Sequence, residues 1–336
     1  MYIRRHLSFR VIYFYTWRLV LLSLFTGSLA LLTYEYYDLK WVAIPWLPVS
    51  LIGVATAFFV GFKNNQSYER NWEARRVWGT ITNLSRSFAA ASKAFINNDL
   101  VAAPLPQQNT DGEVRALLYR HIGWLYTLKH AMHQRTTWEH MDRASQLQRK
   151  GLRTHDNPYQ EQVAKYLSSG ELAGLAQKKN AAVHLLDRQS QHLADLKRKG
   201  LIDDFRHMEL QQMVSAMYDE QGKSERIKNT PFPRQYATSS TIFILIFTVL
   251  LPFSMIKEFK NLGDGLIWLL VPFNLVVTWV FLLMEYTGDV SENPFEGLLN
   301  DVPLRTIVRN IEIDIKEMLG ETDLPEKIQP RYGSIH

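Results

Sequence analysis

Long uncharged runs alternate with strongly charged stretches along this chain. Four runs contain no Asp, Glu, Lys or Arg: Leu19–Tyr34, Trp41–Phe62, Gln235–Ile256 and Gly265–Met284. A helix needs about 20 apolar residues to cross the hydrocarbon core of a bilayer, and the last three runs reach that length. The first is shorter, but Val11–Trp17 extends it past Arg18, whose long side chain can reach the headgroups. The pattern predicts four transmembrane helices.

Aromatic residues at the ends of these runs support a membrane location over a set of buried helices in a soluble protein. Trp and Tyr are enriched at membrane–water interfaces, and here they are Tyr13, Trp17, Trp41, Trp46, Tyr236 and Tyr286. The basic N-terminus before the first run also suggests a signal peptide. That interpretation is rejected, because the run continues to bulky tyrosines without a small-residue cleavage site.

The Lys and Arg residues beside the runs predict the orientation, because cytoplasmic loops carry an excess of them. They are concentrated before the first run, after the second and before the third, at Arg4, Arg5, Arg10, Lys63, Arg70, Arg75, Arg76, Lys223, Arg226, Lys228 and Arg234. The opposite loops carry only Lys40, Lys257 and Lys260. We therefore expect both termini and residues 63–234 in the cytoplasm.

Composition narrows the function classes. The 336 residues carry 38 Lys and Arg against 33 Asp and Glu, a net charge of +5 that is too mild for a nucleic-acid binder. The absence of cysteine excludes disulfides, thiolate metal sites and a cysteine nucleophile. No phosphate-binding glycine loop and no nucleophile elbow is present. We expect neither an enzyme nor a cofactor.

The remaining residues read as helices with a period near 3.6. The expected helices are Glu69–Phe95, Gly112–Met132, Tyr159–Ser168, Glu171–Lys199, Asp203–Gln221 and the amphipathic Leu304–Leu319, which buries Ile307, Ile311 and Ile315. The predicted fold class is an all-α membrane protein with a helical cytoplasmic region. The expected parts are residues 1–62 with spans 1 and 2, the cytoplasmic 63–234, spans 3 and 4 in 235–284, and a cytoplasmic tail, 285–336.

Histidines offer the only metal candidates. His130 and His133 lie at i, i+3 with Glu139 and His140 nearby, a spacing that can present ligands on one helix face. Solvated helix histidines are the favoured interpretation, and the same holds for the group His184, Asp187 and His192. We expect no metal site. The runs also lack the ionisable residues that coupled pumps keep at mid-membrane.

The second run carries an unusual pattern. Val54, Phe58 and Phe62 lie at i, i+4 and i+8, which places them in one stripe along a helix. Small residues that permit close helix packing occupy another face, at Gly53, Ala57 and Gly61. Around a ring of subunits the stripe would form stacked apolar collars that gate by dewetting. From spacing alone, a stripe that faces lipid or core remains the favoured alternative.

Three motifs resemble the bestrophin family in its prokaryotic branch. Residues 61–79, GFKNNQSYERNWEARRVWG, are similar to the family pattern GFRNxxxYxRWWExRxxWG. The strings NTPFPRQY (residues 229–236) and ENPF (292–295), followed by NDVPL (300–304) and IEIDI (311–315), agree in order and spacing. The resemblance covers nearly the whole chain.

The resemblance implies a homopentameric ion channel in the bacterial inner membrane, with monovalent ions passing passively through a pore on the five-fold axis. Its partners are then copies of itself, the lipid bilayer and the permeant ions. The hydrophobic neck carries over to Val54, Phe58 and Phe62. A cytoplasmic aperture carries over to Phe205, with Ile202 as the less favoured position.

The chain departs from the family in two places. Animal members hold a regulatory calcium ion with an acidic run after the Asn-Pro-Phe turn, whereas residues 296–301 here offer too few oxygen ligands. We expect a channel that calcium does not gate, and opening by a calcium titration would contradict this. Asn71 replaces an aromatic residue of the family pattern, which we interpret as a tolerated packing change.

The sequence alone does not decide whether the channel selects cations or anions. Asp203 and Asp204 adjoin the proposed aperture and would form a carboxylate ring that favours cations. Lys63 and Asn64 lie just beyond the neck, where they would attract anions. We lean slightly to cations, with anions close behind. The alternative function is a membrane-anchored scaffold or sensor that conducts no ions.

Overall fold

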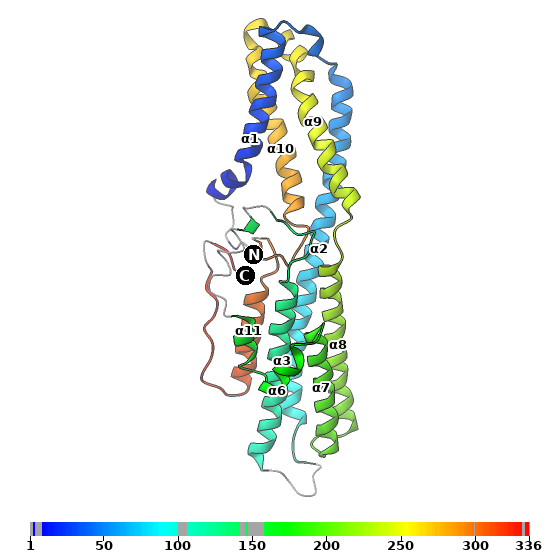
Figure 1. Ribbon diagram of the computed structural model, residues 1–336, viewed down its shortest axis with the longest axis vertical. Helices are drawn as coiled ribbons and strands as arrows, with labels where there is room; N and C mark the ends of the chain where they lie inside the picture. The colour runs from blue at the N-terminus through cyan, green and yellow to red at the C-terminus, as the bar shows by residue number, and fades with distance from the viewer. Residues whose placement is uncertain are drawn as a thin grey trace. The chain divides into compact units, whose positions relative to one another are not determined.

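The computed structural model describes residues 3, 9–99, 106–141, 145–146, 158–298, 300–330 and 333–335. These residues form helices joined by turns (Figure 1) and confirm the predicted all-α class. The chain divides into two compact units. We call Arg4–Asn71 with Pro231–Asn293 the apolar unit, and Trp72–Thr230 with Pro294–His336 and Met1–Ile3 the polar unit.

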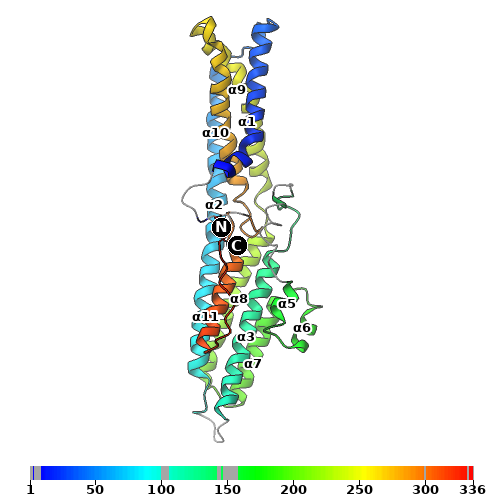
Figure 2. The same ribbon diagram turned by 90° about the vertical axis from the view of Figure 1, so that its left-hand side faces the viewer.

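The apolar unit contains the four predicted spans. They are α1 (Phe9–Leu31), continued by a π-helical turn (Leu32–Tyr36), the first part of α2 (Trp46–Phe95), α9 (Arg234–Asn261) and α10 (Leu270–Asp289). Short 3₁₀ turns (Lys40–Val42 and Asp264–Leu269) precede α2 and α10. Three helical stretches, Lys40–Phe95, Arg234–Asn261 and Asp264–Asp289, are long and apolar enough to cross a membrane, and Val20–Tyr36 is a shorter apolar helix. Within this unit the helices run side by side (Figures 1 and 2).

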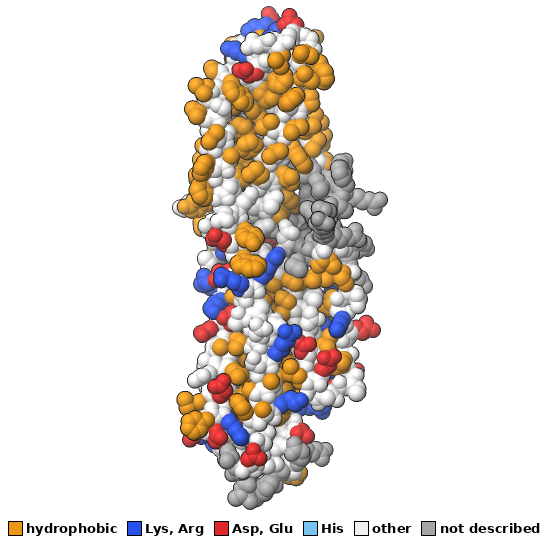
Figure 3. Space-filling view, turned by 180° about the vertical axis from the view of Figure 1, so that it is seen from behind, with side chains coloured by type: hydrophobic (Ala, Val, Ile, Leu, Met, Phe, Trp, Pro, Cys, Tyr) orange, Lys and Arg blue, Asp and Glu red, His pale blue; other side chains and the backbone are white. Residues whose placement is uncertain are grey.

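A polar seam joins α1 to α10 inside this unit. The side-chain amide of Asn274 is buried and donates to the backbone carbonyl of Ser23 at 2.8 Å. A Cβ at Gly27 would lie 3.1 Å from the same amide, so the glycine permits the close approach. Small residues and interhelical hydrogen bonds are the usual means of packing helices in lipid. On the face seen in Figure 3, the surface of the unit is largely hydrophobic.

The polar unit is a helical bundle with its own core. It contains the rest of α2, α3 (Gln107–Met132), α5 (Tyr159–Val163), α6 (Ser169–Leu175), α7 (Ala181–Arg198), α8 (Asp204–Asn229) and α11 (Leu304–Met318). The largest buried side chains include Trp78, Phe88 and Trp124. The indole of Trp124 donates to Gln221 at 2.9 Å. Charged side chains are scattered over the face of this unit seen in Figure 3.

Several predicted boundaries are wrong for local reasons. The expected helix Glu171–Lys199 is two helices, because Asn180 caps a new one by accepting a hydrogen bond from the Val183 backbone. α8 continues eight residues past the predicted end at Gln221 and ends at Asn229, because Thr230 precedes a proline, which disfavours helical backbone there. Span 2 and the expected helix Glu69–Phe95 form one unbroken 50-residue helix, α2.

Candidate ion pathway

In the apolar unit, α2 buries one face and exposes the other. Thr56, Val60 and Lys63 lie on the buried face, at the i, i+4, i+7 spacing of a single helical stripe. Phe59 lies near the edge of this face, and its ring meets that of Phe243 on α9 edge to face at 5.0 Å. A Cβ at Gly53 would come within 2.7 Å of the Phe247 ring, so this glycine permits close packing on α9.

The predicted neck residues lie on the opposite, exposed face of α2. Val54, Phe58 and Phe62 are 60%, 65% and 59% exposed in the single chain. The rings of Phe58 and Phe62 contact each other with centroids 5.8 Å apart. Of the two glycines on the predicted small-residue face, Gly53 makes a close contact, whereas a Cβ at Gly61 would meet no described atom within 4 Å. No described helix of the apolar unit covers the stripe.

Lys63 does not lie on this face, which corrects the expectation that it attracts anions beside the neck. Its side chain is buried, and its ammonium pairs with the Glu285 carboxylate of α10 at 2.6 Å. The hydroxyls of Ser240 and Thr241 donate to the same carboxylate. Asn64 is also directed away, since its side chain lies against Gly288 of α10. Sequence reasoning missed Glu285 because its partner is 222 residues away.

The predicted aperture residue lies in the first turn of α8 in the polar unit. Phe205 is 84% exposed, an unusual state for a phenylalanine next to a well-packed core. Ile202 is 2% exposed within that core, so it is not available to line a pore. The structure therefore separates the two positions that the sequence left open.

The two aspartates beside Phe205 have local partners. Asp203 is the N-cap of α8 and accepts a hydrogen bond from the Arg206 backbone at 2.8 Å. Asp204 pairs with Lys197, and this ammonium lowers the pKa of the carboxyl. The neighbouring basic side chains compensate part of the negative charge at both positions. Any carboxylate ring here is weaker than two free aspartates per subunit would make it.

The carboxylates in the turn after α10 bind other groups of the same chain. Glu296 is buried, and its carboxylate lies 3.0 Å from Nδ1 of His140. Asp301 is buried and accepts hydrogen bonds from the backbone of Gly297 at 2.7 Å and of Leu298 at 3.0 Å. These contacts stabilise the turn and use oxygens that a calcium site would need. Insensitivity to calcium stays a prediction.

Asp301 makes the stability of the polar unit depend on pH. Desolvation raises the pKa of its carboxyl to about 7, although two backbone N–H groups and charged neighbours act on it as well. The unfolded chain releases this proton near the ordinary pKa, so the stabilisation is complete below about pH 4 and disappears as the pH rises through about 7. We expect wild-type protein to lose thermal stability from pH 5 to pH 8, by at most about 3 kcal/mol, because only the two pH units below the folded pKa of about 7 contribute in this window. Asp301→Asn, which keeps the acceptor oxygen, should flatten the melting temperature over this range, and an unchanged slope would contradict the assignment.

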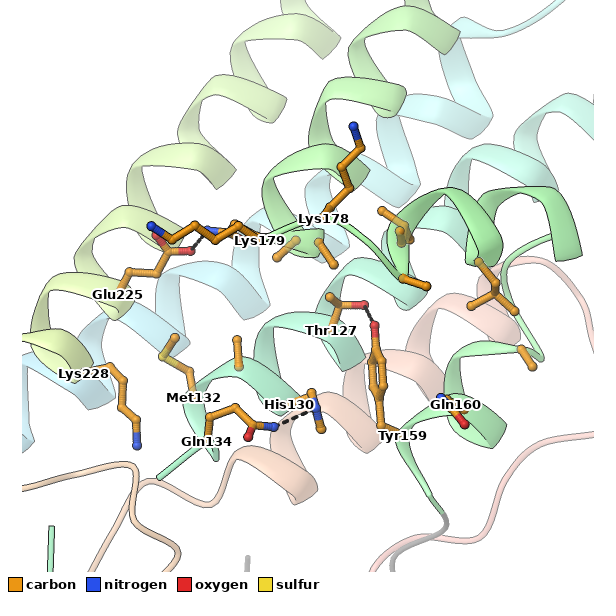
Figure 4. A pocket seen from close by; sticks show the side chains of 18 of the residues that line it. Thr127, His130, Met132, Gln134, Tyr159, Gln160, Lys178, Lys179, Glu225 and Lys228 are labelled. Atoms are coloured by element: carbon orange, nitrogen blue, oxygen red, sulfur yellow. Dashed lines mark hydrogen bonds between the residues drawn. The ribbon is translucent and has the colours of Figure 1, made fainter. Parts of the chain in front are cut away.

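His130, one of the candidate histidines, makes contacts within the polar unit. A cavity of about 890 Å³ in the polar unit is lined by residues of α3, α5, α6, α7 and α8 (Figure 4). His130 lines it, hydrogen-bonds with Gln134 at 2.7 Å and stacks on Tyr159 with ring centroids 4.2 Å apart. Lys228 also lines the cavity and pairs with buried Glu139. Among the residues that the structure describes, no three His, Asp or Glu side chains are placed to hold a metal ion.

Asn71 lies on the buried face of α2, in line with the interpretation of its substitution as a packing change. Comparison with known proteins decides the family. The sequence profile of the Bacterial/Fungal Bestrophin protein family matches residues 4–317. The chain belongs to the bestrophin family.

Similar proteins agree with this assignment. The voltage-dependent anion channel-forming protein YneE of Escherichia coli K12 is 26% identical over 298 residues, covering 88% of this chain and 83% of YneE. A protein of the same description from Ralstonia nicotianae, RSc3414, is 27% identical over 301 residues, covering 86% and 85% of the two chains. These relatives are named as channel-forming proteins, which confirms the prediction that this bestrophin is not an enzyme.

Solved structures show the same fold. A bacterial bestrophin homologue from Klebsiella pneumoniae superposes with a TM-score of 0.72 at 20% identity, covering 90% of this chain and 98% of the homologue. The crystal structure of a membrane-protein variant gives a TM-score of 0.75 at 21% identity, covering 92% of this chain and all of the other. The helical membrane-channel fold predicted from the sequence is thereby confirmed for this bestrophin.

Proposed function

We propose that this chain assembles as a homopentamer whose five α2 helices surround a pore for monovalent ions. The single observation that carries the proposal is the exposed stripe of Val54, Phe58 and Phe62 on a helix long enough to cross a membrane. Four helices in one subunit enclose no aqueous path, so symmetry must supply one. Stacked apolar rings would form a neck that water leaves readily, which makes it a gate.

The second constriction in this proposal is the aperture formed by Phe205 in the polar unit. Its exposure supports this role, because a ring of subunits would bring five such side chains around one axis. The charge excess of Lys and Arg beside the spans supports an inner-membrane location with both termini in the cytoplasm. The mouth of the pore at the Phe205 aperture is then cytoplasmic.

We infer only weak charge selection at the aperture. Asp203 and Asp204 favour cations, but Arg206 and Lys197 offset part of their charge. The names of the relatives favour the second candidate, an anion channel. Reversal potential separates the two, because the potassium and chloride equilibrium potentials have opposite signs in a KCl gradient.

The test is planar-bilayer recording of the purified protein under a KCl gradient. We expect a current that reverses on the potassium side of zero. The double substitution Asp203→Asn and Asp204→Asn should move the reversal potential toward chloride by only a few millivolts, since partial compensation already weakens this ring, while asparagine preserves the helix cap. Reversal of the wild type at the chloride potential would favour the anion channel. If neither the wild type nor variants with the neck widened by Phe58→Ala and Phe62→Ala carry current, the non-conducting scaffold is favoured.

A further inference from the structure

Beyond Phe62, the exposed face of α2 becomes polar within the same unit. Successive helix residues are rotated by about 100°, so Phe58 and Phe62 lie about 40° apart around the axis. Glu69 falls between them in angle and about 10 Å farther along the helix. Its side chain is exposed, as are those of the neck residues. The neck stripe therefore continues directly into a carboxylate.

The charge of Glu69 has no counterion among the described residues of the apolar unit. Its Oε1 accepts a hydrogen bond from the Asn65 side chain, which is neutral, at 3.0 Å. The nearest cation toward the neck, Lys63, is rotated to the buried face and neutralised by Glu285. Asp203 and Asp204, in contrast, each lie beside a basic side chain. Glu69 is thus the acidic group on the neck face whose charge remains uncompensated.

We propose that Glu69 is the main charge-selecting residue of this channel and favours monovalent cations. The proposal rests on the pentameric pore proposed above, in which five Glu69 carboxylates would ring the pore just inside the neck. A ring of carboxylates raises the local concentration of cations and lowers that of anions. Position 69 is unspecified in the family pattern GFRNxxxYxRWWExRxxWG, so this preference belongs to the present chain and need not hold for its relatives.

The first test measures the permeability ratio of potassium to chloride in planar bilayers at low salt. Five charges about 10 Å from an ion act over roughly one Debye length, so we expect Glu69→Gln to lower this ratio about fivefold. Glu69→Lys should invert the preference. The effect should shrink when salt is raised to about 1 M, where the Debye length is about 3 Å. The matched control is Glu161→Gln, which removes one exposed carboxylate per subunit from α5.

Each substitution is recorded with the wild-type neck and in the Phe58→Ala, Phe62→Ala background, so that a closed neck does not hide the result. Current with an unchanged ratio in Glu69→Gln would overturn the role of Glu69 and leave the channel intact. Silence in both backgrounds would overturn the channel and this inference with it.

A second test needs no current. The chain contains no cysteine, so Glu69→Cys introduces a single thiol per subunit. If residue 69 faces a five-fold axis, a short bis-maleimide should link neighbouring subunits into a ladder of up to five chains, whereas Glu161→Cys should give none. Absence of the ladder from Glu69→Cys would show that the residue does not face the axis and would overturn the proposal.

Discussion

Replacing Phe58 and Phe62 together by alanine is expected to raise the single-channel or macroscopic current about tenfold or more. The aromatic rings are the widest side chains of the exposed stripe, and their removal both widens the neck and lowers the cost of hydrating it. A tenfold change corresponds to only about 1.4 kcal/mol in the barrier, which is modest for two ring deletions. The measurement is bilayer recording at equal protein incorporation.

Phe25 supplies the matched control for this experiment. It lies on α1 of the apolar unit and is 65% exposed, the same exposure as Phe58. Phe25→Ala removes one equally exposed ring from a helix outside the proposed pore, so the current should not change. An equal response to both substitutions, or no response to the neck substitutions, would show that the α2 stripe faces lipid.

Lys63→Met should destabilise the protein by about 3–5 kcal/mol, the usual cost of leaving one member of a buried ion pair alone. The remaining carboxylate of Glu285 would keep its bonds from Ser240 and Thr241 but lose its counter-charge. Thermal unfolding in detergent, followed by helix content, measures the loss. The double variant Lys63→Met, Glu285→Gln should recover much of it, because no charge is then buried.

The control for this prediction is Lys260→Met. Lys260 pairs with Glu35 at 3.0 Å near the surface of the same unit. Exposed pairs contribute about 0–1 kcal/mol, so this substitution should change the melting temperature little. Equal losses from Lys63→Met and Lys260→Met would show that Lys63 is less buried than the structure places it.

The spans could be predicted because crossing a bilayer requires a long run without charged residues, and such a run is visible in the sequence itself. A charge-free run of about 20 residues is typical of a membrane-spanning helix, and each of the four runs here is mainly helical. Spacing also placed Phe58 and Phe62 on one face of α2, but it did not decide whether that face meets a pore, lipid or the core. The apolar face of α11 could be predicted in the same way: Ile311 and Ile315 are buried, whereas Ile307, predicted with them, is only partly buried.

Tertiary partners could not be predicted in the same way. From the sequence, Lys63 looks like a free cation next to the neck, because its partner Glu285 lies on another helix, far away along the chain. Phe205 and Ile202 are both apolar residues before the same anchor, and only packing shows that one is exposed and the other buried. The break before α7 depends on one capping contact of Asn180, which competes closely with helix propensity over the preceding residues.

The pairing of Lys63 with Glu285 has a consequence for electrical behaviour. A protein senses membrane voltage by moving net charge through the field, at about 2.3 kcal/mol per elementary charge per 100 mV. The four charge-free runs carry no such charge, and the cation that follows the second run is bound to an anion, so the pair moves as a neutral object. Steep voltage dependence in this channel would therefore have to originate in the ions and water inside the neck, or in Arg18 beside the first run.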